Sequence, residues 1–274
     1  MDDRDKNCRY CLDRLQMPSI PQIVAATFVK QVEFHAEIGS TNDRALDLAA
    51  AEVSPETPLL IWALQQTAGR GRGANRWWAS EGSLTFSLML DTSALHLPQE
   101  RWPQVSLTTG LAVCAALQEL LPQAEIGLKW PNDVFLHGRK ICGILVEIPP
   151  RQSGKLIVGI GINVNNSLNA APAELWPTAT ALCDASNRPW DLADVLIQVL
   201  QQLERHLCQL SANDPELPQR WHELCFLRGR LIHHTVGDRV TIGRCQGVDQ
   251  QGALLLQTET GLSRVLGGVI TKWE

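Results

Sequence analysis

The amino-acid sequence changes character near Phe226, and that change limits the possible folds more than any other feature. Beyond Phe226, short runs that alternate apolar and polar residues, such as Arg239–Ile242 and Ala253–Leu256, are separated by glycines. Glycine turns at intervals of about 8 to 12 residues are typical of small all-β domains. We therefore expect a small β-barrel at 226–274, separate from the rest of the chain.

The longer part before residue 226 predicts helices and buried strands instead. Residues 1–22 form a polar leader that ends at Pro18 and Pro21, and we expect one larger domain at 23–225. Ser40 or Thr41, and later Asp191, stand ahead of apolar residues at helical spacing, where N-cap residues are favoured. Predicted strands cover 23–34, 58–64, 84–90, 125–130, 133–136, 140–148 and 156–164, with a hairpin turn at 137–138, and predicted helices cover 41–53, 104–121, 190–210 and 215–225.

Charge and apolar patterning restrict the partners and the location of the chain. The chain has 24 Lys and Arg against 29 Asp and Glu, so its net charge is −5, which argues against binding to DNA or anionic membranes through bulk charge. No apolar run approaches the roughly 18 residues of a membrane span. The charged N-terminus does not resemble a signal peptide. We expect a cytoplasmic protein that binds neither DNA nor membranes.

The eight cysteines do not form a disulfide or zinc pattern. Cys8 and Cys11 are the only C-x-x-C pair, and no second pair or histidine pair stands at zinc-site spacing. We expect reduced, mostly buried thiols and no metal site.

A loop rich in glycine and arginine, 66–78, is the first candidate for chemistry. Glycines allow close backbone approach to a ligand, and arginines supply forked donors for phosphate and carboxylate. A solvated surface loop is the alternative, but Trp77 and Trp78 at its C-terminal end favour a ligand. The spacing of Gly69, Gly71 and Ala74 also matches a dinucleotide fingerprint. However, 75–83 lacks helical spacing and is too short for a crossover helix, and no P-loop occurs.

Three further segments carry polar residues beside predicted strands or helices. In 129–133, Lys129 ends an apolar strand ahead of a rigid Pro-Asn-Asp turn, where it could face developing negative charge or simply occupy an edge. In 159–165, glycines alternate with β-branched residues, which allows close approach, and Asn163 offers a donor and an acceptor. In 40–43, Ser-Thr-Asn-Asp is explained as a helix cap, or could bind a polar ring.

Together these segments resemble the biotin protein ligases. The family has, in order, an S-T-N cluster, a Q-x-A-G-R-G-R-x-G loop, K-W-P-N-D, a G-R-K-x-x-G-I-L-x-E strand and G-x-G-x-N-x-N. This chain has them at 40–42, 66–74, 129–133, 138–147 and 159–165, and its C-terminal part fits the family as well. It departs from many members at 74–75 and 79–80, where Ala-Asn and Ala-Ser replace Gly-Arg and Ser-Pro.

The resemblance implies a fold and a reaction. The fold is α+β, a mixed sheet with packed helices like the class II synthetase-like catalytic core of biotin and lipoate ligases, followed by an SH3-like C-terminal barrel. The reaction has two steps: biotin and Mg²⁺-ATP give biotinyl-5'-AMP, and a lysine of a biotin carboxyl carrier protein then accepts the biotin.

The resemblance also implies roles for individual residues. We expect Lys129 to bridge the biotin carboxylate and the α-phosphate, and Arg70 and Arg72 to close over the adenylate, with Lys129 and Arg72 as the catalytic pair. Gln66 and the 40–42 cluster would bind the ureido ring. The full set expected to contact biotin or adenylate is Ser40, Thr41, Asn42, Gln66, Gly69, Arg70, Gly71, Arg72, Trp77, Lys129, Asn132, Lys140, Gly143, Gly161 and Asn163.

Some family members carry an added N-terminal helix-turn-helix that represses biotin genes. The catalytic strands begin near residue 24, so we expect a ligase without that module, either a monomer or a homodimer. Two alternatives remain. A lipoate ligase or octanoyltransferase would share the core fold but lack the loop joined to K-W-P-N-D. A non-catalytic biotin-binding or transcription-related protein is the second, and the intact Lys129, Arg70 and Arg72 argue against it.

Overall fold

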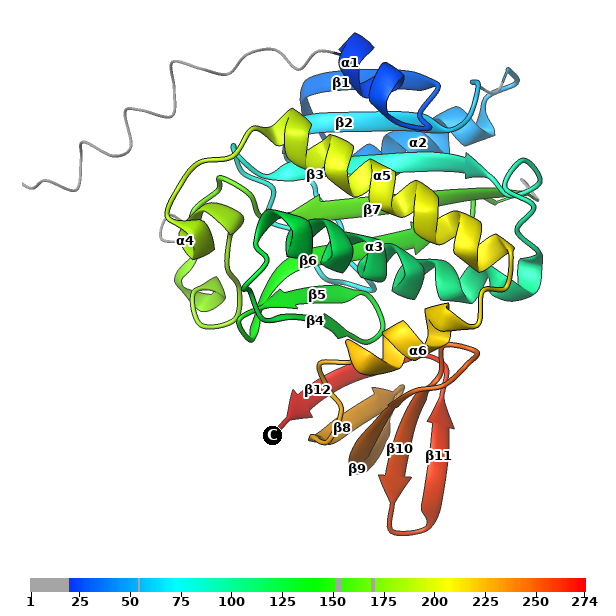
Figure 1. The fold of residues 1–274 in the computed structure, drawn as a ribbon, viewed down its shortest axis with the longest axis vertical. Helices are drawn as coiled ribbons and strands as arrows, with labels where there is room; N and C mark the ends of the chain where they lie inside the picture. The colour runs from blue at the N-terminus through cyan, green and yellow to red at the C-terminus, as the bar shows by residue number, and fades with distance from the viewer. Residues whose placement is uncertain (1–19, 54, 151–153, 169–170) are drawn as a thin grey trace, which may run out of the picture.

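A computed structural model of the chain describes residues 20–53, 55–150, 154–168 and 171–274. The predicted leader up to residue 19, with Cys8 and Cys11, lies outside the described residues. The described chain forms a seven-stranded sheet with helices on both faces and a smaller five-stranded sheet at its C-terminal end (Figure 1). None of the helices in the described ranges is long and apolar enough to cross a membrane.

The large sheet is mixed, as predicted, with the strand order β1-β2-β3-β7-β6-β5-β4. β1 and β2 are parallel, and every other neighbouring pair is antiparallel. Its strands are β1 (Gln31–Ile38), β2 (Leu59–Gln66), β3 (Leu84–Asp91), β4 (Ile126–Lys129), β5 (Asp133–Leu136), β6 (Arg139–Glu147) and β7 (Lys155–Ile162). The helices are α1 (Ile20–Ala26), α2 (Thr41–Ala50), α3 (Val105–Leu120), α4 (Leu182–Ser186), α5 (Leu192–Ser211) and α6 (Glu216–Glu223), with short 3-10 turns at Gln99–Gln104 and Ala173–Leu175.

Alternation along the central strands supplies both faces of this sheet with apolar residues. In β2, Leu60 and Trp62 belong to the core shared with α3 and α5, whereas Leu59 and Ile61 pack in a second cluster with Ala45 and its neighbours on α2. A strand buried on both faces gives a continuous apolar run, and the run at 58–64 predicts such a strand. Figure 1 shows α3 and α5 on the near face and α2 on the far face.

Two predicted caps and one predicted hairpin are confirmed. Ser40 Oγ accepts the backbone N–H of Asp43 at 3.3 Å, and Asp191 caps α5 by accepting two N–H groups. The turn at 137–138 joins β5 to β6 with positive φ angles of 49° at His137 and 75° at Gly138, the geometry that a tight hairpin requires.

The predicted strand at 23–34 is wrong in its first half. Residues Ile20–Ala26 form helix α1 with Ile23 fully buried, and the strand begins only at Gln31. Pro21 suits a first helical turn, and Thr27 closes the helix by donating its hydroxyl to the Ile23 carbonyl at 2.8 Å. The predicted boundary after residue 22 therefore falls inside α1.

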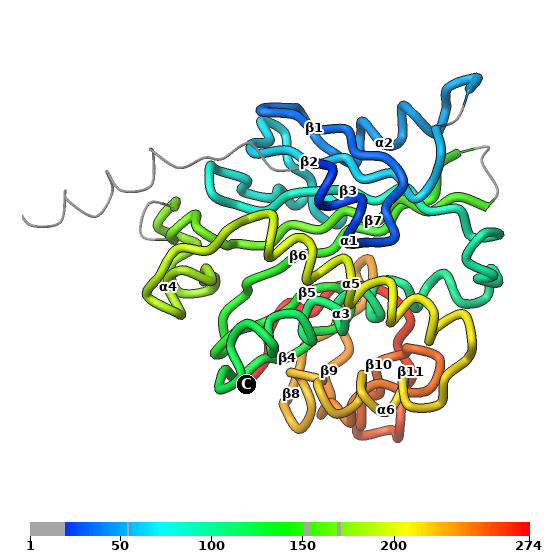
Figure 2. Tube along the Cα trace, turned by 45° about the horizontal axis from the view of Figure 1, so that its top comes forward, coloured from blue at the N-terminus to red at the C-terminus, as the bar shows by residue number. Residues whose placement is uncertain are grey.

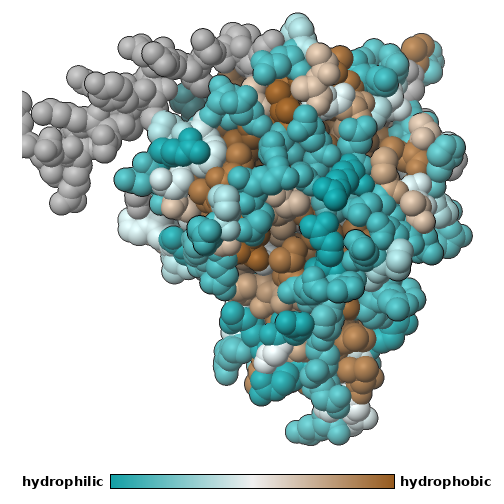
Figure 3. Space-filling view, viewed as in Figure 1, coloured by the Kyte–Doolittle hydropathy of each residue, from teal (hydrophilic) through white to brown (hydrophobic). Residues whose placement is uncertain are grey.

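The C-terminal domain is a five-stranded antiparallel sheet with the strand order β11-β10-β9-β8-β12. Its strands are β8 (Leu231–Val236), β9 (Arg239–Val248), β10 (Leu254–Thr258), β11 (Gly261–Val265) and β12 (Val269–Trp273). The tandem histidines alternate on β8, with His234 buried and His233 half-buried. Apolar side chains also reach the surface over these strands (Figure 3), including Val240, Ile242 and Leu262.

The two domains share a continuous interface. Trp130 is buried and donates its indole N–H to the Gly252 carbonyl at 3.1 Å. On the other side of the interface, the ring of Phe135 stacks on Phe226 and meets Trp273 edge-on at 6.2 Å. β12 thereby lies beside β4 and β5 of the large sheet in both views of the chain (Figure 2). The interface places residues of the C-terminal domain beside the polar segments at 66–78 and 129–133.

Candidate active site

A cavity of about 620 Å³ opens on the face of the large sheet that α2 partly covers. Its floor is made of the small residues of β6 and β7 and its walls come from three places in the chain: the N-terminus of α2, the loop after β2, and the end of the C-terminal domain. The lining includes Ser40, Thr41, Asn42, Gln66, Arg70, Gly71, Arg72, Asn75, Arg76, Trp77, Lys129, Trp130, Asn132, Asp133, Lys140, Gly143, Gly159, Gly161, Gly268, Val269 and Trp273.

The glycines of β6 and β7 form a flat seat for the indole of Trp77. Gly143 and Gly161 are register partners on neighbouring strands. A Cβ added to Gly161 would come within 2.4 Å of the Trp77 ring, and one added to Gly143 within 3.2 Å. Two positions earlier in β7, a Cβ on Gly159 would collide with the Asn42 amide at 2.1 Å. The alternating glycines therefore let two cavity side chains lie directly on the sheet.

The loop after β2 is a short hairpin-like arm that carries Trp77. Gly71 and Asn75 are joined by a 2.8 Å backbone hydrogen bond, and Trp77 N–H donates to the Gly69 carbonyl at 3.0 Å. Gly69 is required here because a Cβ would come within 2.6 Å of the Trp77 carbonyl oxygen. No helix follows the arm before β3, so the dinucleotide fingerprint is excluded in this part of the chain, as the sequence predicts.

The Ser-Thr-Asn cluster at the start of α2 is bound mostly to the protein itself. Thr41 donates its backbone N–H to Gln66 Oε1 at 2.7 Å, and its hydroxyl accepts the hydroxyl of Ser87 at 2.7 Å. Ser87 lies within hydrogen-bond distance of Asn42 Oδ1 as well, at 2.5 Å. Because a backbone donor fixes Oε1 of Gln66, the Nε2 group of this amide is left as its donor for a ligand.

Two lysines and one carboxylate form a charged cluster at the opposite end of the cavity. Lys140 Nζ contacts Asp133 Oδ1 at 2.6 Å, and Lys129 Nζ lies 3.8 Å from Asp133 Oδ2. Lys129 is only 12% exposed and lies 4.7 Å from the centre of the Trp273 ring. Burial lowers the pKa of Lys129 below its usual value, although the Asp133 carboxylate partly opposes this shift.

The two arginines of the arm have different surroundings. Arg70 makes a two-pronged ion pair with Glu147, at 3.0 and 2.7 Å, and a third contact with Asp43 at 2.7 Å. The hydrogen bonds to Glu147 raise the pKa of Arg70 above its usual value. Arg72 instead meets two neutral oxygens, Asn132 Oδ1 at 3.3 Å and the Gly268 carbonyl at 3.4 Å, which are long and therefore weak hydrogen bonds.

The cavity wall carries more cations than carboxylates although the chain is acidic overall. Among the described residues, five cations line the cavity, namely Arg70, Arg72, Arg76, Lys129 and Lys140, and Asp133 is the only carboxylate in the lining. The net charge of the chain is −5. No group of three His, Cys, Asp or Glu residues that could hold a metal occurs in the described ranges. The arrangement suits organic ligands that carry negative charge.

Of the residues predicted to contact ligand, the structure brings all but Gly69 and Asn163 to the cavity wall. Asn163 is 4% exposed; its amide donates to the Thr180 carbonyl at 3.0 Å and accepts from Asn166 at 3.0 Å. Its polar atoms are thus used inside the fold, where they tie the end of β7 to the following loop.

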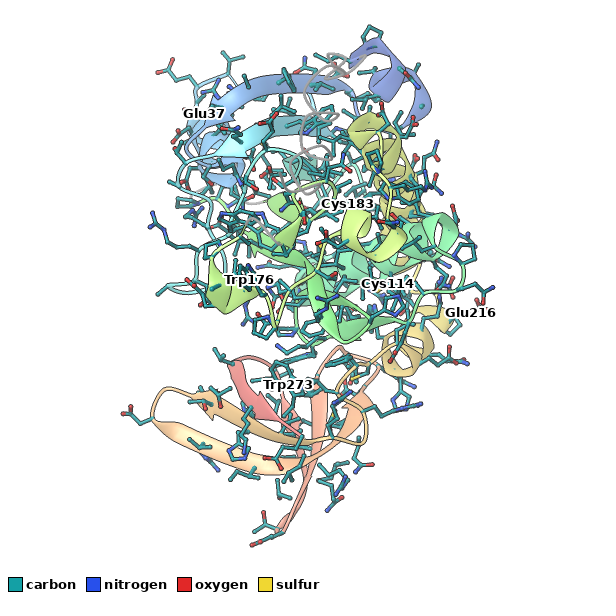
Figure 4. All side chains as sticks on the ribbon, turned by 90° about the vertical axis from the view of Figure 1, so that its left-hand side faces the viewer. Glu37, Cys114, Trp176, Cys183, Glu216 and Trp273 are labelled. Carbon is teal, nitrogen blue, oxygen red and sulfur yellow. The ribbon has the colours of Figure 1, made fainter. Side chains whose placement is uncertain are left out.

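The sequence prediction missed several wall residues. Asp133 belongs to the K-W-P-N-D motif, so its position beside Lys129 was available as a signal. Gly268 and Trp273 carry no such signal, because nothing in their local sequence links them to a site more than a hundred residues earlier. Figure 4 shows Trp273 at the junction of the two domains, where it reaches the Lys129 ammonium.

Comparison with known proteins gives the same picture over most of the chain. Residues 36–165 match the biotin/lipoate A/B protein ligase family and residues 229–273 match the biotin protein ligase C-terminal domain. The chain is 33% identical over 259 residues to the biotin–[acetyl-CoA-carboxylase] ligase of Mycobacterium tuberculosis, covering 93% of each protein. It is 31% identical to the bifunctional ligase/repressor BirA of Bacillus subtilis, over 85% of this chain and 71% of that protein.

A solved structure is similar across both domains. The biotin protein ligase of Aquifex aeolicus in complex with biotin and ATP aligns with a TM-score of 0.76 at 30% identity, covering 89% of this chain and 99% of that one. The mixed sheet, the helices and the C-terminal antiparallel sheet therefore have the arrangement predicted from the sequence. With these matches, and with the ordered motifs gathered around one cavity, the chain belongs to the biotin protein ligase family.

Proposed function

We propose that the cavity is the active site of a biotin–[acetyl-CoA-carboxylase] ligase. The enzyme joins biotin to ATP as biotinyl-5'-AMP and transfers the biotin to a lysine of the biotin carboxyl carrier protein. The relative from M. tuberculosis carries the name of this activity, and the related A. aeolicus structure was solved with biotin and ATP.

The observation that carries the proposal is the charge of the cavity wall. Five cations and one carboxylate line it, and although Arg70 is paired with Glu147 and Asp43, the other four cations still outnumber Asp133, in a chain whose net charge is −5. The first step joins a carboxylate to a polyphosphate, so two anions must approach each other. Cations that are fixed in place before the substrates arrive lower the cost of that approach and stabilise the charge that develops at phosphorus.

The buried Lys129 is the group we assign to that reacting centre. The biotin carboxylate attacks the α-phosphate, pyrophosphate leaves, and the ammonium of Lys129 faces both reacting groups. Trp273 and Phe135 flank Lys129 with their rings at 4.7 and 5.7 Å, which restricts the orientation of its side chain. Lys140, on the more open side of Asp133, faces the phosphates.

The opposite end of the cavity suits the ureido ring of biotin. Gln66 presents Nε2 as a donor because its Oε1 already accepts from Thr41. Asn42 and Ser87 hold Thr41 and Gln66 in place from behind. Specificity for biotin then rests on hydrogen bonds to the ring, which reject analogues that lack matching polar groups.

We infer that ATP enters as its Mg²⁺ complex. Asp133 is the single carboxylate in the described lining, and both its oxygens lie beside lysines. A protein that holds Mg²⁺ mainly through substrate phosphates needs only one or two carboxylates. The lining fits a metal carried by ATP better than a metal held in a protein cage.

Biotin-dependent exchange of pyrophosphate into ATP tests the proposal directly. Labelled pyrophosphate should enter ATP with biotin, and not with lipoate, octanoate or no acid. Exchange with lipoate or octanoate alone would establish the lipoate ligase alternative. Biotin binding without exchange would establish a non-catalytic biotin-binding protein. Transfer is then checked by labelling a purified carrier domain and its variant that lacks the target lysine.

A further inference from the structure

We propose that Glu147 is a positioning residue that anchors Arg70, and with it the arm, over the cavity before substrates bind. Of the two arm arginines, Arg72 alone is then left to face the anionic substrates. This inference rests on the proposed function for its consequence in catalysis, but the anchoring itself is a property of the ligand-free protein. Glu147 does not line the cavity.

The contacts of Arg70 show that its charge is already matched. Both oxygens of Glu147 accept from its guanidinium, at 3.0 and 2.7 Å, and Asp43 is a second carboxylate at 2.7 Å. A two-pronged arginine–carboxylate pair fixes direction as well as distance. Only its Nε lacks a hydrogen-bond partner among the described residues, and two carboxylates already balance the charge that an incoming phosphate would need.

Glu147 connects the arm to the ring-binding end of the cavity. Its Oε2 also accepts the Asn42 amide at 2.8 Å. Asn42 lies against Gly159 on β7 and contacts Ser87, which reaches Thr41 and through it Gln66. One carboxylate at the end of β6 therefore orients a residue of the arm and a residue of the α2 N-terminus together.

Arg72 is held differently, although it lies only two residues away on the same arm. None of the ion pairs among the described residues involves Arg72, and its two hydrogen bonds are at 3.3 and 3.4 Å to neutral oxygens. An arginine with weak neutral partners keeps its charge for an incoming anion. The two arginines of the G-R-G-R sequence thus have different roles: Arg70 fixes the arm, and Arg72 binds the anionic substrates.

The test compares Glu147→Gln with a matched variant, Glu33→Gln. Glu33 makes the same kind of two-pronged pair, with Arg44 at 2.6 and 3.1 Å, and is similarly exposed at 27% against 24% for Glu147. The Glu33 pair lies outside the cavity lining. A general loss of ion pairing would affect both variants equally.

The first measurement is trypsin cleavage after the arm arginines in the ligand-free protein, followed by mass spectrometry. Glu147→Gln should raise the cleavage rate about tenfold, because one partly exposed charge-assisted pair is lost. A tenfold change corresponds to a loss of about 1.4 kcal/mol from the free energy that favours the closed arm. Glu33→Gln should match the wild type. An unchanged cleavage rate in Glu147→Gln would overturn the anchoring.

The second measurement is biotin-dependent pyrophosphate exchange with Glu147→Gln, Arg70→Gln and the double variant. If Glu147 acts through Arg70, KM for biotin rises about tenfold in Glu147→Gln, kcat changes less, and the double variant is no worse than Arg70→Gln. Effects that multiply would refute action through Arg70. If the wild type shows no exchange with biotin, the proposed function fails, while the cleavage rates still decide whether Glu147 anchors the arm.

Discussion

Replacing Gly161 with alanine should disturb the cavity through a single added methyl group. The new Cβ would lie 2.4 Å from Trp77 Cε2 and 2.5 Å from Nε1, whereas carbon atoms pack at about 3.5 to 4.0 Å. The indole must therefore move by about 1 Å or more. The ring of Trp77 rests over Gly143 and Gly161, so the added methyl group pushes it off the sheet and into the cavity that it lines. Overpacking of this kind typically costs about 1–3 kcal/mol.

This cost must appear either in stability or in ligand binding. If Trp77 stays on its seat, the folded state is strained and Tm falls by about 2–4 °C for each kcal/mol. If Trp77 leaves, the shape of the cavity changes and KM for ATP or biotin rises by about 5- to 150-fold. Pyrophosphate exchange and calorimetry on the same preparation measure both. The expected result is a clear loss in at least one.

Gly39→Ala supplies the control, because a Cβ there would meet nothing within 4 Å. Gly39 lies directly before the Ser40 cap, so the control variant tests a position equally near the cavity. Its Tm should stay within about 1 °C of the wild type and its KM within about twofold. Differences of this size are ordinary for surface substitutions. If Gly161→Ala behaves in the same way, Trp77 does not rest on β7 and the account of the glycine seat is incorrect.

Four other outcomes follow from the site and the core. Lys129→Ala should slow single-turnover adenylate formation by about 100- to 1000-fold and weaken biotin binding less, since a donor at the reacting centre is removed; a rate within about threefold of wild type would rule out its role. Burial lowers the pKa of Lys129 below the value of 10.5 for an ordinary lysine. The rate of exchange should therefore decline as the pH rises towards 10.5, because the Lys129 cation is lost. A rate that stays constant up to that pH would contradict this role of the cation. Arg72→Gly should still form adenylate but release it, so that serum albumin in the mixture becomes biotinylated; unlabelled albumin with continued biotin-dependent ATP use would show that other contacts retain it. Burial also lowers the pKa of His206, so below about pH 6.5 the unfolded chain takes up a proton that the folded protein resists. The free energy of unfolding should therefore fall from about pH 7 to about pH 5, and it should fall less in His206→Gln. An equal fall in the wild type and in His206→Gln would refute the role of His206.

The regular part of the fold was predictable because alternation and capping are local. The buried run that contains Trp62, the caps at Ser40 and Asp191, and the hairpin turn after β5 each depend on a few neighbouring residues. Helix α1 was missed because its short apolar run, with Ile23 inward, fits a strand equally well in isolation. Short apolar runs are ambiguous in this way until tertiary packing decides.

The candidate site was predictable where motifs carried it and not where long-range packing did. Arg72 and Lys129 stand in ordered motifs, and the structure brings them to one cavity. Asn163 stands in a motif too, but a buried amide that bridges backbone groups has the same sequence as one that faces a ligand. β12 was not predicted, because it pairs with β8, a strand that lies far from it in the sequence.

The position of β12 has a consequence for the biosynthesis of the protein. The main cation cluster and the glycine seat lie between residues 70 and 161, whereas Gly268 and Trp273 are added to the wall only with the last described strand. A nascent chain that has reached β11 contains every strand of the large sheet, yet the carbonyl beside Arg72 and the ring beside Lys129 are still missing. Synthesis therefore supplies every strand of the large sheet before it supplies these two residues of the cavity wall.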